Sequence, residues 1–171
     1  ELDDLTNILE LVKIPKRIEC YDISNIQGSH AVGSMIVFTK GVPDKSQYRK
    51  FSIKYTPKNK PNDFAMMSEV IARRIRHPEW PTADLIIIDG GKGQLSSAVK
   101  TLTNHKKNIP ITALAKKNEE LFIPGKSSPI ILKKQSPAYF LVQRIRDEAH
   151  RFAIQYYLSL IHISETTRPI H

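Results

Sequence analysis

The sequence predicts an α/β fold in which helices flank a mixed, five-stranded sheet with an added β-hairpin. Two observations lead to this prediction. Three strand-like segments come first, separated by short turns rich in Gly, Pro, Asn and Asp, a pattern typical of an antiparallel meander. Helix-like and strand-like segments then alternate, and a strand–helix–strand step requires a parallel crossover.

The first part of the chain predicts one helix and three strands. Residues 1–16 place apolar side chains at helical spacing and predict a helical lead-in that ends before Pro15. Residues 17–24 and 31–39 are rich in apolar and β-branched side chains and predict two strands. The third predicted strand, 48–55 (YRKFSIKY), has one apolar and one largely polar face.

The second part begins with a predicted helix over 64–77, for which Asp63 is the expected N-cap. The run DLIIID (84–89) is apolar between two aspartates, which is typical of a strand buried on both faces in parallel pairing. The remaining predicted elements are a tight turn over Gly90–Gly93, a helix over 94–105, a strand over 109–115, a hairpin of 120–123 with 129–133, and a long helix from Pro137 to about Leu160, capped by Ser136.

Three regions are expected along the chain. Residues 1–16 form the lead-in, and 17–160 form one domain, since 171 residues suffice for one sizeable core but not for two ordinary domains. Residues 161–171 lose all periodicity, so we expect a non-native or disordered tail. The first residue is Glu rather than Met, which suggests a fragment of a longer protein.

The charge is the most unusual property of the composition. Lys and Arg number 26 against 17 acidic residues, a net charge of +9, which indicates an anionic partner, with nucleic acid favoured over an acidic membrane. No segment approaches the ~20 apolar residues of a spanning helix, and the N-terminus does not resemble a signal peptide. Cys20 is the only cysteine, which excludes an internal disulfide and favours a cytoplasmic location.

Two aspartates are the most informative candidate site residues. Asp22 and Asp89 each lie near the end of an apolar strand and precede turn-forming residues. Open α/β folds bind ligands at the carboxyl edge of the sheet, and two carboxylates held together there favour a divalent cation between them. Turn capping is the better interpretation of either aspartate alone; for the pair we favour a metal site.

The run after Asp89, Gly-Gly-Lys-Gly-Gln, does not fit the phosphate-loop pattern. Its glycines allow either a tight strand-to-helix turn or a close approach to phosphate, to which Lys92 would add charge. His150 lies in the run RIRDEAHR of the long helix. By itself it is interpreted as an ordinary surface or hydrogen-bonded histidine.

Several basic clusters favour a groove that binds the nucleic-acid backbone. Residues 40–60 are strongly basic and interleave Tyr48, Phe51 and Tyr55 with lysine and arginine. A solvated charged face is the ordinary alternative for any single run. We expect DNA contacts along the side where the aspartates emerge, at Lys50, Lys54, Arg73 and Lys92.

Six segments, in this order, resemble the C-terminal endonuclease domain of UvrC, the incision subunit of bacterial nucleotide excision repair. They are IECYDISNIQG, YRKFSIK, NDFAMMSEV, LIIIDGGKGQLSSA, LAKKNEELFIPG and QRIRDEAHRFAI. The resemblance covers about Arg17 to Leu158 and implies an RNase H-like fold with an Asp–Asp–His site at Asp22, Asp89 and His150. It also implies Mg²⁺ or Mn²⁺ as cofactor, the 5′ incision in damaged double-stranded DNA as activity, and UvrB as a partner of the full-length protein.

Two alternatives belong to other functional classes. The first is a module that binds DNA or a repair partner without cutting, through the same basic clusters. It is suggested by the parts of the full-length family that we do not find in this sequence, namely a GIY-YIG nuclease domain, a UvrB-binding segment and helix-hairpin-helix modules. The presence of both aspartates and the histidine favours the endonuclease. A nucleotide hydrolase built on Gly90–Gly93 is less favoured, because that loop is too short and no second nucleotide motif occurs.

Overall fold

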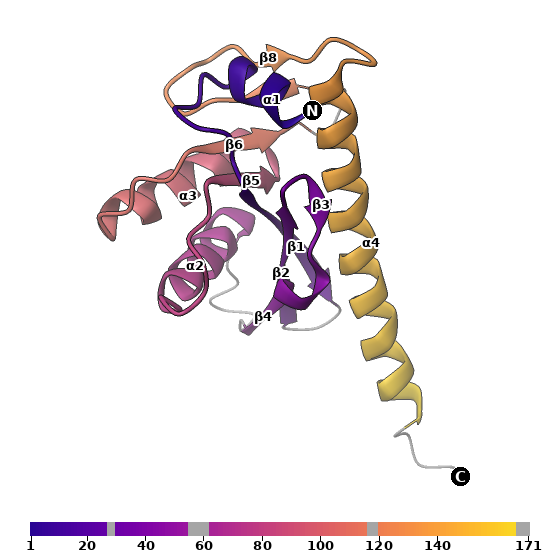
Figure 1. Ribbon diagram of the computed structural model, residues 1–171. Coiled ribbons are helices and arrows are strands. Elements are labelled where there is room, and N and C mark those ends of the chain that lie inside the picture. The colour runs from indigo at the N-terminus through magenta and orange to yellow at the C-terminus, as the bar shows by residue number, and fades with distance from the viewer. Residues whose placement is uncertain (27–29, 55–61, 116–119, 167–171) are drawn as a thin grey trace.

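A mixed eight-stranded sheet forms the centre of the structure, with helices on both of its faces (Figure 1). The computed structural model describes residues 1–26, 30–54, 62–115 and 120–166. The strands are β1 (Arg17–Ile26), β2 (His30–Thr39), β3 (Val42–Pro43), β4 (Arg49–Lys54), β5 (Leu85–Asp89), β6 (Ile111–Leu114), β7 (Glu120–Phe122) and β8 (Ile130–Ile131). The helices are α1 (Leu2–Ile8), α2 (Asp63–Ile75), α3 (Gly91–Asn104) and α4 (Pro137–Thr166), with a short 3₁₀ helix, η1, at Lys45–Gln47.

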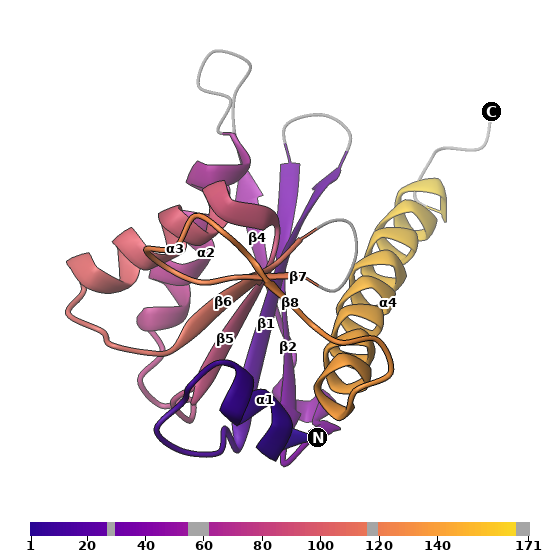
Figure 2. The ribbon, with the colours of Figure 1, turned by 90° about the horizontal axis from the view of Figure 1, so that it is seen from above.

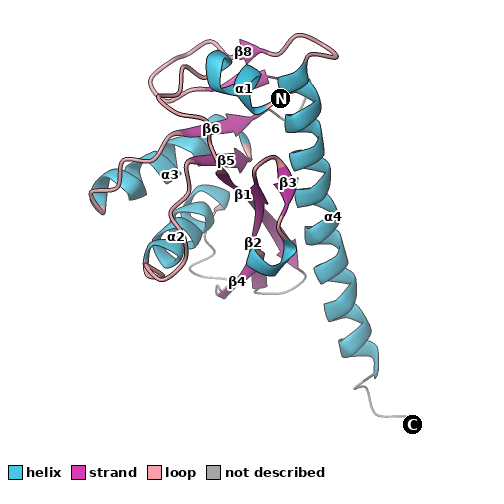
Figure 3. Ribbon diagram, viewed as in Figure 1, coloured by secondary structure: helices cyan, strands magenta, loops and turns pink. Residues whose placement is uncertain are grey.

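Five of these strands form the predicted mixed sheet. β1 pairs antiparallel with β2, and β2 with β4, so the predicted meander is confirmed. β5 pairs parallel with β1 on one side and β6 on the other, as the apolar run DLIIID predicted. The two-residue β3 pairs with the far end of β2, and the predicted hairpin, β7–β8, extends the sheet beyond β6 (Figure 3).

The two faces of the sheet carry separate halves of the core. α2 and α3 cover one face, where they pack on Tyr21, Met35 and Ile88. α4 and α1 cover the other face, where they pack on Cys20, Ile36 and Ile87. Figure 2 shows this layering, with α2 and α3 on one side of the strands and α4 on the other. Because neighbouring strand residues alternate between faces, the register decides which side chains meet α4.

Several predicted boundaries need correction. The lead-in helix ends at Ile8 rather than just before Pro15. The N-cap of α2 is Asn62, whose side chain accepts a hydrogen bond from the Ala65 N–H at 2.8 Å, so Asp63 is the first helical residue instead of the cap. The side chain of Ser136 accepts from the Tyr139 N–H at 3.2 Å, which confirms the predicted start of α4.

The C-terminal segment is the largest departure from prediction. α4 continues to Thr166, so the first six residues of the expected tail, 161–166, are helical, and 167–171 lie outside the described residues. Within the described part of the chain, no helix combines the length and the apolar character needed to cross a membrane.

Candidate active site

Asp22 and Asp89 lie next to each other on neighbouring strands. The parallel pairing of β1 with β5 ends with Tyr21 opposite Ile88, and the two aspartates are the next residue on each strand. Asp89 is the last residue of β5, whereas Asp22 lies inside β1, which continues to Ile26 alongside β2. Asp22 comes two residues after Cys20, and Asp89 two residues after Ile87; both Cys20 and Ile87 pack under α4. Both carboxylates therefore belong to the α4 face of the sheet.

The electrostatics agree with this proximity. Burial, and next the negative charge of Asp89, raise the pKa of Asp22 to about 7, with a smaller contribution from Asp63 at the start of α2. The pKa of the buried Cys20 thiol is also raised, by burial first and then by the charges of Asp89 and Asp22. Two carboxylates that share a partly buried site repel each other, so the arrangement favours either a bound proton or a bound cation.

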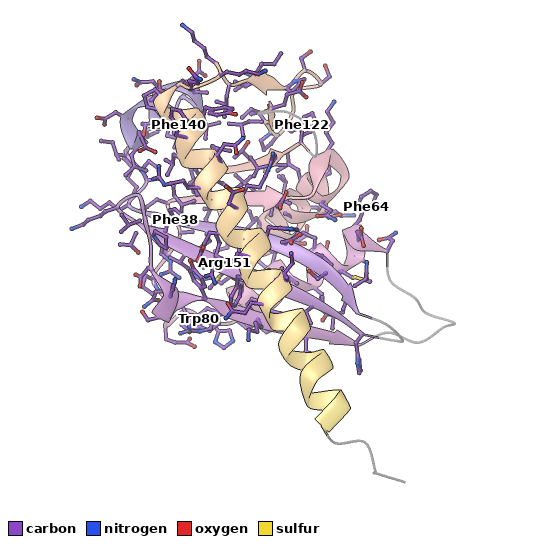
Figure 4. The ribbon with its side chains drawn as sticks, turned by 90° about the vertical axis from the view of Figure 1, so that its right-hand side faces the viewer. Phe38, Phe64, Trp80, Phe122, Phe140 and Arg151 are labelled. Carbon is purple, nitrogen blue, oxygen red and sulfur yellow. The ribbon has the colours of Figure 1, made fainter. Side chains whose placement is uncertain are left out.

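α4 passes over the sheet in front of these strands, as Figure 4 shows from the helix side. The guanidinium of Arg146 donates to the carbonyl oxygen of Ala115, just after β6, at 2.6 Å. Further along the helix, the Lys50 ammonium of β4 lies 5.4 Å from the centre of the Phe152 ring. α4 thus extends from the β6 side of the aspartate pair to the β4 side.

His150 lies one turn after Arg146, on the same flank of α4, and its side chain is exposed. Its helix packs on the face of the sheet to which the aspartates belong. Among the described residues, however, no group of three or more His, Cys, Asp and Glu side chains is close enough to form a metal site. The structure brings the two aspartates together, and His150 remains a predicted member of the site.

The four expected DNA-contacting residues do not share one surface. Lys50 is exposed on the same face as the aspartates, but Arg73 belongs to α2 on the opposite face. The Arg73 guanidinium donates to the backbone oxygen of Ser52 at 2.6 Å and lies 5.5 Å from the centre of the Phe51 ring. The expectation of one groove on the aspartate side is therefore wrong for Arg73. The side chain of Lys54 lies outside the described residues.

Lys92 occupies the first turn of α3, three residues after Asp89. Its ammonium donates to the backbone oxygen of Ser127 and lies 5.1 Å from the centre of the Phe122 ring. Lys92 also lines a cavity of about 290 Å³, together with Lys100 and Lys126. Lys92 therefore contributes to a basic hollow beside α3, at the carboxyl edge of β5.

The glycines around Lys92 have a structural role. Gly91 has a φ of +86°, a conformation that side-chain-bearing residues rarely adopt. A Cβ on Gly93 would lie 2.2 Å from the Phe64 ring of α2, so this glycine allows α3 to start against α2. These contacts support the interpretation of a tight strand-to-helix turn.

The aromatic residues of the basic segment are likewise structural. Phe51 is buried in the core under α2, and Tyr48 packs edge-on against Phe152, with ring centres 5.1 Å apart. The Tyr48 hydroxyl also donates to a Glu148 carboxylate oxygen at 2.7 Å. Phe51 is therefore a core residue, Tyr48, just before β4, packs against α4, and Tyr55 lies outside the described residues.

Ser34 of β2 is not among the residues predicted for the site. β2 places it directly opposite Asp22 in the antiparallel pairing of β1 and β2, and therefore on the same face. The only available signal in the sequence was a hydroxyl within the otherwise apolar run AVGSMIVF.

Comparison with known proteins identifies the family of this chain. The family model described as "UvrC RNAse H endonuclease domain" matches residues 6–154. The chain belongs to this family. The RNase H-like fold class and the resemblance seen in the six sequence segments are thereby confirmed.

Curated relatives carry the name UvrABC system protein C. The protein of Dictyoglomus thermophilum is 52% identical over 162 residues, which cover 93% of this chain and 27% of that protein. The protein of Methanosarcina acetivorans is 48% identical over 159 residues, which cover 91% of this chain and 30% of that protein. The chain thus spans between a quarter and a third of the length of these relatives.

Among solved structures, endonuclease V of Ciona intestinalis in complex with inosine-containing DNA is similar, with a TM-score of 0.45 and 12% identity. The match covers 85% of this chain and 65% of that one.

Proposed function

We propose that this chain is the divalent-metal-dependent DNA endonuclease domain that makes the 5′ incision in nucleotide excision repair. The observation that carries the proposal is the placement of Asp22 and Asp89 side by side on the α4 face of the sheet. Membership of the UvrC RNase H endonuclease domain family supports it. The proposed substrate is damaged double-stranded DNA, and the proposed partner within the longer protein is UvrB, in the cytoplasm.

The residues present suit a hard divalent cation, Mg²⁺ or Mn²⁺. Carboxylate oxygens are the ligands such ions prefer, and a cation between Asp22 and Asp89 would offset the burial and the repulsion that together raise the pKa of Asp22. Asp22 and Asp89 would hold the ion, with His150 as the third proposed ligand. When bound, such an ion activates water as a nucleophile and neutralises charge on the phosphate oxygens.

The other groups of the site would position the DNA and handle protons. His150 is exposed on α4, the helix that covers the aspartate face, and its imidazole is the proposed group that exchanges a proton with the leaving oxygen or with solvent. The Lys50 ammonium lies on the same face and would bind a backbone phosphate. Lys54, Arg73 and Lys92 remain proposed DNA contacts, although Arg73 lies on α2, which covers the face of the sheet opposite the aspartates.

Substitution of the aspartates in the full-length protein tests this function. Asp22→Asn and Asp89→Asn should each reduce 5′ incision of a damaged duplex by more than about 100-fold, because several kcal/mol of charge stabilisation are lost. Asp84→Asn is a matched control, since Asp84 precedes β5 and binds Lys13 and the backbone of Arg17, away from the aspartate pair.

Incision that continues unchanged in the Asp22 and Asp89 variants would exclude these residues from the chemistry. DNA binding without any metal-dependent cleavage by the wild-type protein would instead support a non-cleaving binding module.

A further inference from the structure

A row of polar side chains crosses the sheet at the aspartate pair. β2 places Ser34 directly opposite Asp22 of β1 on one side and opposite Lys50 of β4 on the other. Directly opposite residues of antiparallel strands point to the same face, with Cβ atoms about 4.5–5.5 Å apart. With Asp89 as the neighbour of Asp22, the row reads Lys50, Ser34, Asp22, Asp89, all on the α4 face.

Ser34 is the most deeply buried member of this row. Only 3% of its surface is exposed, and its Oγ makes no hydrogen bond with the part of the chain that the structure describes. A buried hydroxyl without a partner costs roughly 1–3 kcal/mol. Its same-face neighbours along β2, Val32 and Ile36, offer no side-chain polar group. An alanine would therefore fit this position at lower cost, unless the hydroxyl acquires a partner when the site is in use.

The chemistry of the row identifies that partner. The two cross-strand neighbours of Ser34 are a carboxylate and an ammonium group, and only the carboxylate can accept a hydrogen bond. A hydroxyl that donates to one carboxylate oxygen fixes the orientation of the carboxylate and leaves its remaining lone pairs for a cation. Such outer hydrogen bonds typically change metal affinity by about 10–100-fold.

We propose that Ser34 is a positioning residue of the metal centre, whose hydroxyl donates to the Asp22 carboxylate when a divalent cation is bound. This inference rests on the proposed metal site at Asp22 and Asp89. Ser34 does not contact the cation or the substrate; it acts through Asp22. Among the described residues the Ser34 hydroxyl has no hydrogen-bond partner, so it is available to donate to the Asp22 carboxylate.

The test measures Mn²⁺ affinity and metal-free stability, so it does not depend on cleavage. Wild type, Ser34→Ala, Ser34→Thr and Asp22→Asn are titrated with Mn²⁺ by calorimetry, and their thermal unfolding is followed in a chelator. Ser52→Ala, at an exposed position of β4, is the matched serine-to-alanine control. We expect Ser34→Ala to bind Mn²⁺ about 10-fold more weakly, while its metal-free melting temperature is unchanged or higher. Ser34→Thr keeps the hydroxyl and should stay within about threefold of wild type, as should Ser52→Ala.

Three kinds of result would overturn the inference. They differ in whether they also reject the proposed metal site. Equal Mn²⁺ affinity of Ser34→Ala and wild type would reject the role of Ser34 and leave the metal site intact. A lower melting temperature of Ser34→Ala in chelator would show that the hydroxyl serves the fold. Absence of Mn²⁺ binding by wild type, or unchanged binding by Asp22→Asn, would reject the metal site itself and the inference with it.

Discussion

The raised pKa of Asp22 predicts a specific dependence of stability on pH. Burial and the charge of Asp89 raise this pKa from 3.8 to about 7. The folded chain then binds the proton more tightly than the unfolded chain, so this group stabilises the fold at acidic pH. The contribution is lost as the pH rises towards the folded pKa, because the folded state must ionise a carboxyl group that the unfolded state has already ionised.

The magnitude follows from the shift. One pKa unit corresponds to about 1.36 kcal/mol, so the full shift is worth about 4 kcal/mol. Asp22 is partly exposed, and solvent screening reduces this value to about 2–3 kcal/mol. Between about pH 4 and about pH 8, wild type should lose that much free energy of unfolding relative to Asp22→Asn, which cannot ionise.

Urea unfolding in a chelator, at several pH values, measures this difference. Asp84→Asn serves as a control with the opposite sign. Although burial raises the pKa of Asp84, hydrogen bonds from the Arg17 backbone and from Lys13 outweigh it and lower the pKa overall. The stability that Asp84 contributes should therefore be lost as the pH falls. A difference between wild type and Asp22→Asn that stays constant with pH would refute the reasoning, because the pKa of Asp22 would then not be raised in the folded state.

Three further predictions concern other parts of the molecule. Glu19→Gln should destabilise the fold by about 3–5 kcal/mol in urea unfolding. Glu19 is 1% exposed, and removing its charge leaves Arg17 and Arg74 without their counter-charge. A decrease in stability below about 1 kcal/mol would contradict a buried ion-pair network. Gly33→Ala should lower the free energy of unfolding by about 1–3 kcal/mol in the same assay, because a Cβ would lie 2.3 Å from a methyl of Val70. Unchanged stability would show that α2 can shift away. Lys50→Ala should weaken DNA binding and reduce the log–log salt slope by about 0.9 in titrations at several salt concentrations, whereas an unchanged slope would remove Lys50 from the DNA contact surface.

The sequence alone determined the elements, the family and the candidate pair of aspartates. Apolar runs and turn residues report local conformation, so the strands of the meander, the buried strand before Asp89 and the start of α4 were predicted close to their observed positions. Boundaries that depend on weaker local signals, such as the end of α1 and the last turns of α4, were wrong.

Tertiary structure decided which of these residues meet. Pairing between strands is a long-range choice, so only the register shows that Asp22 has Asp89 on one side and Ser34 on the other. The face covered by each helix is also decided by long-range contacts. Because α2 covers the face opposite the aspartates, Arg73 lies on that face and Phe51 is buried in the core beneath it. Local periodicity identifies which side chains share a face of one strand, but burial against distant elements determines which face that is.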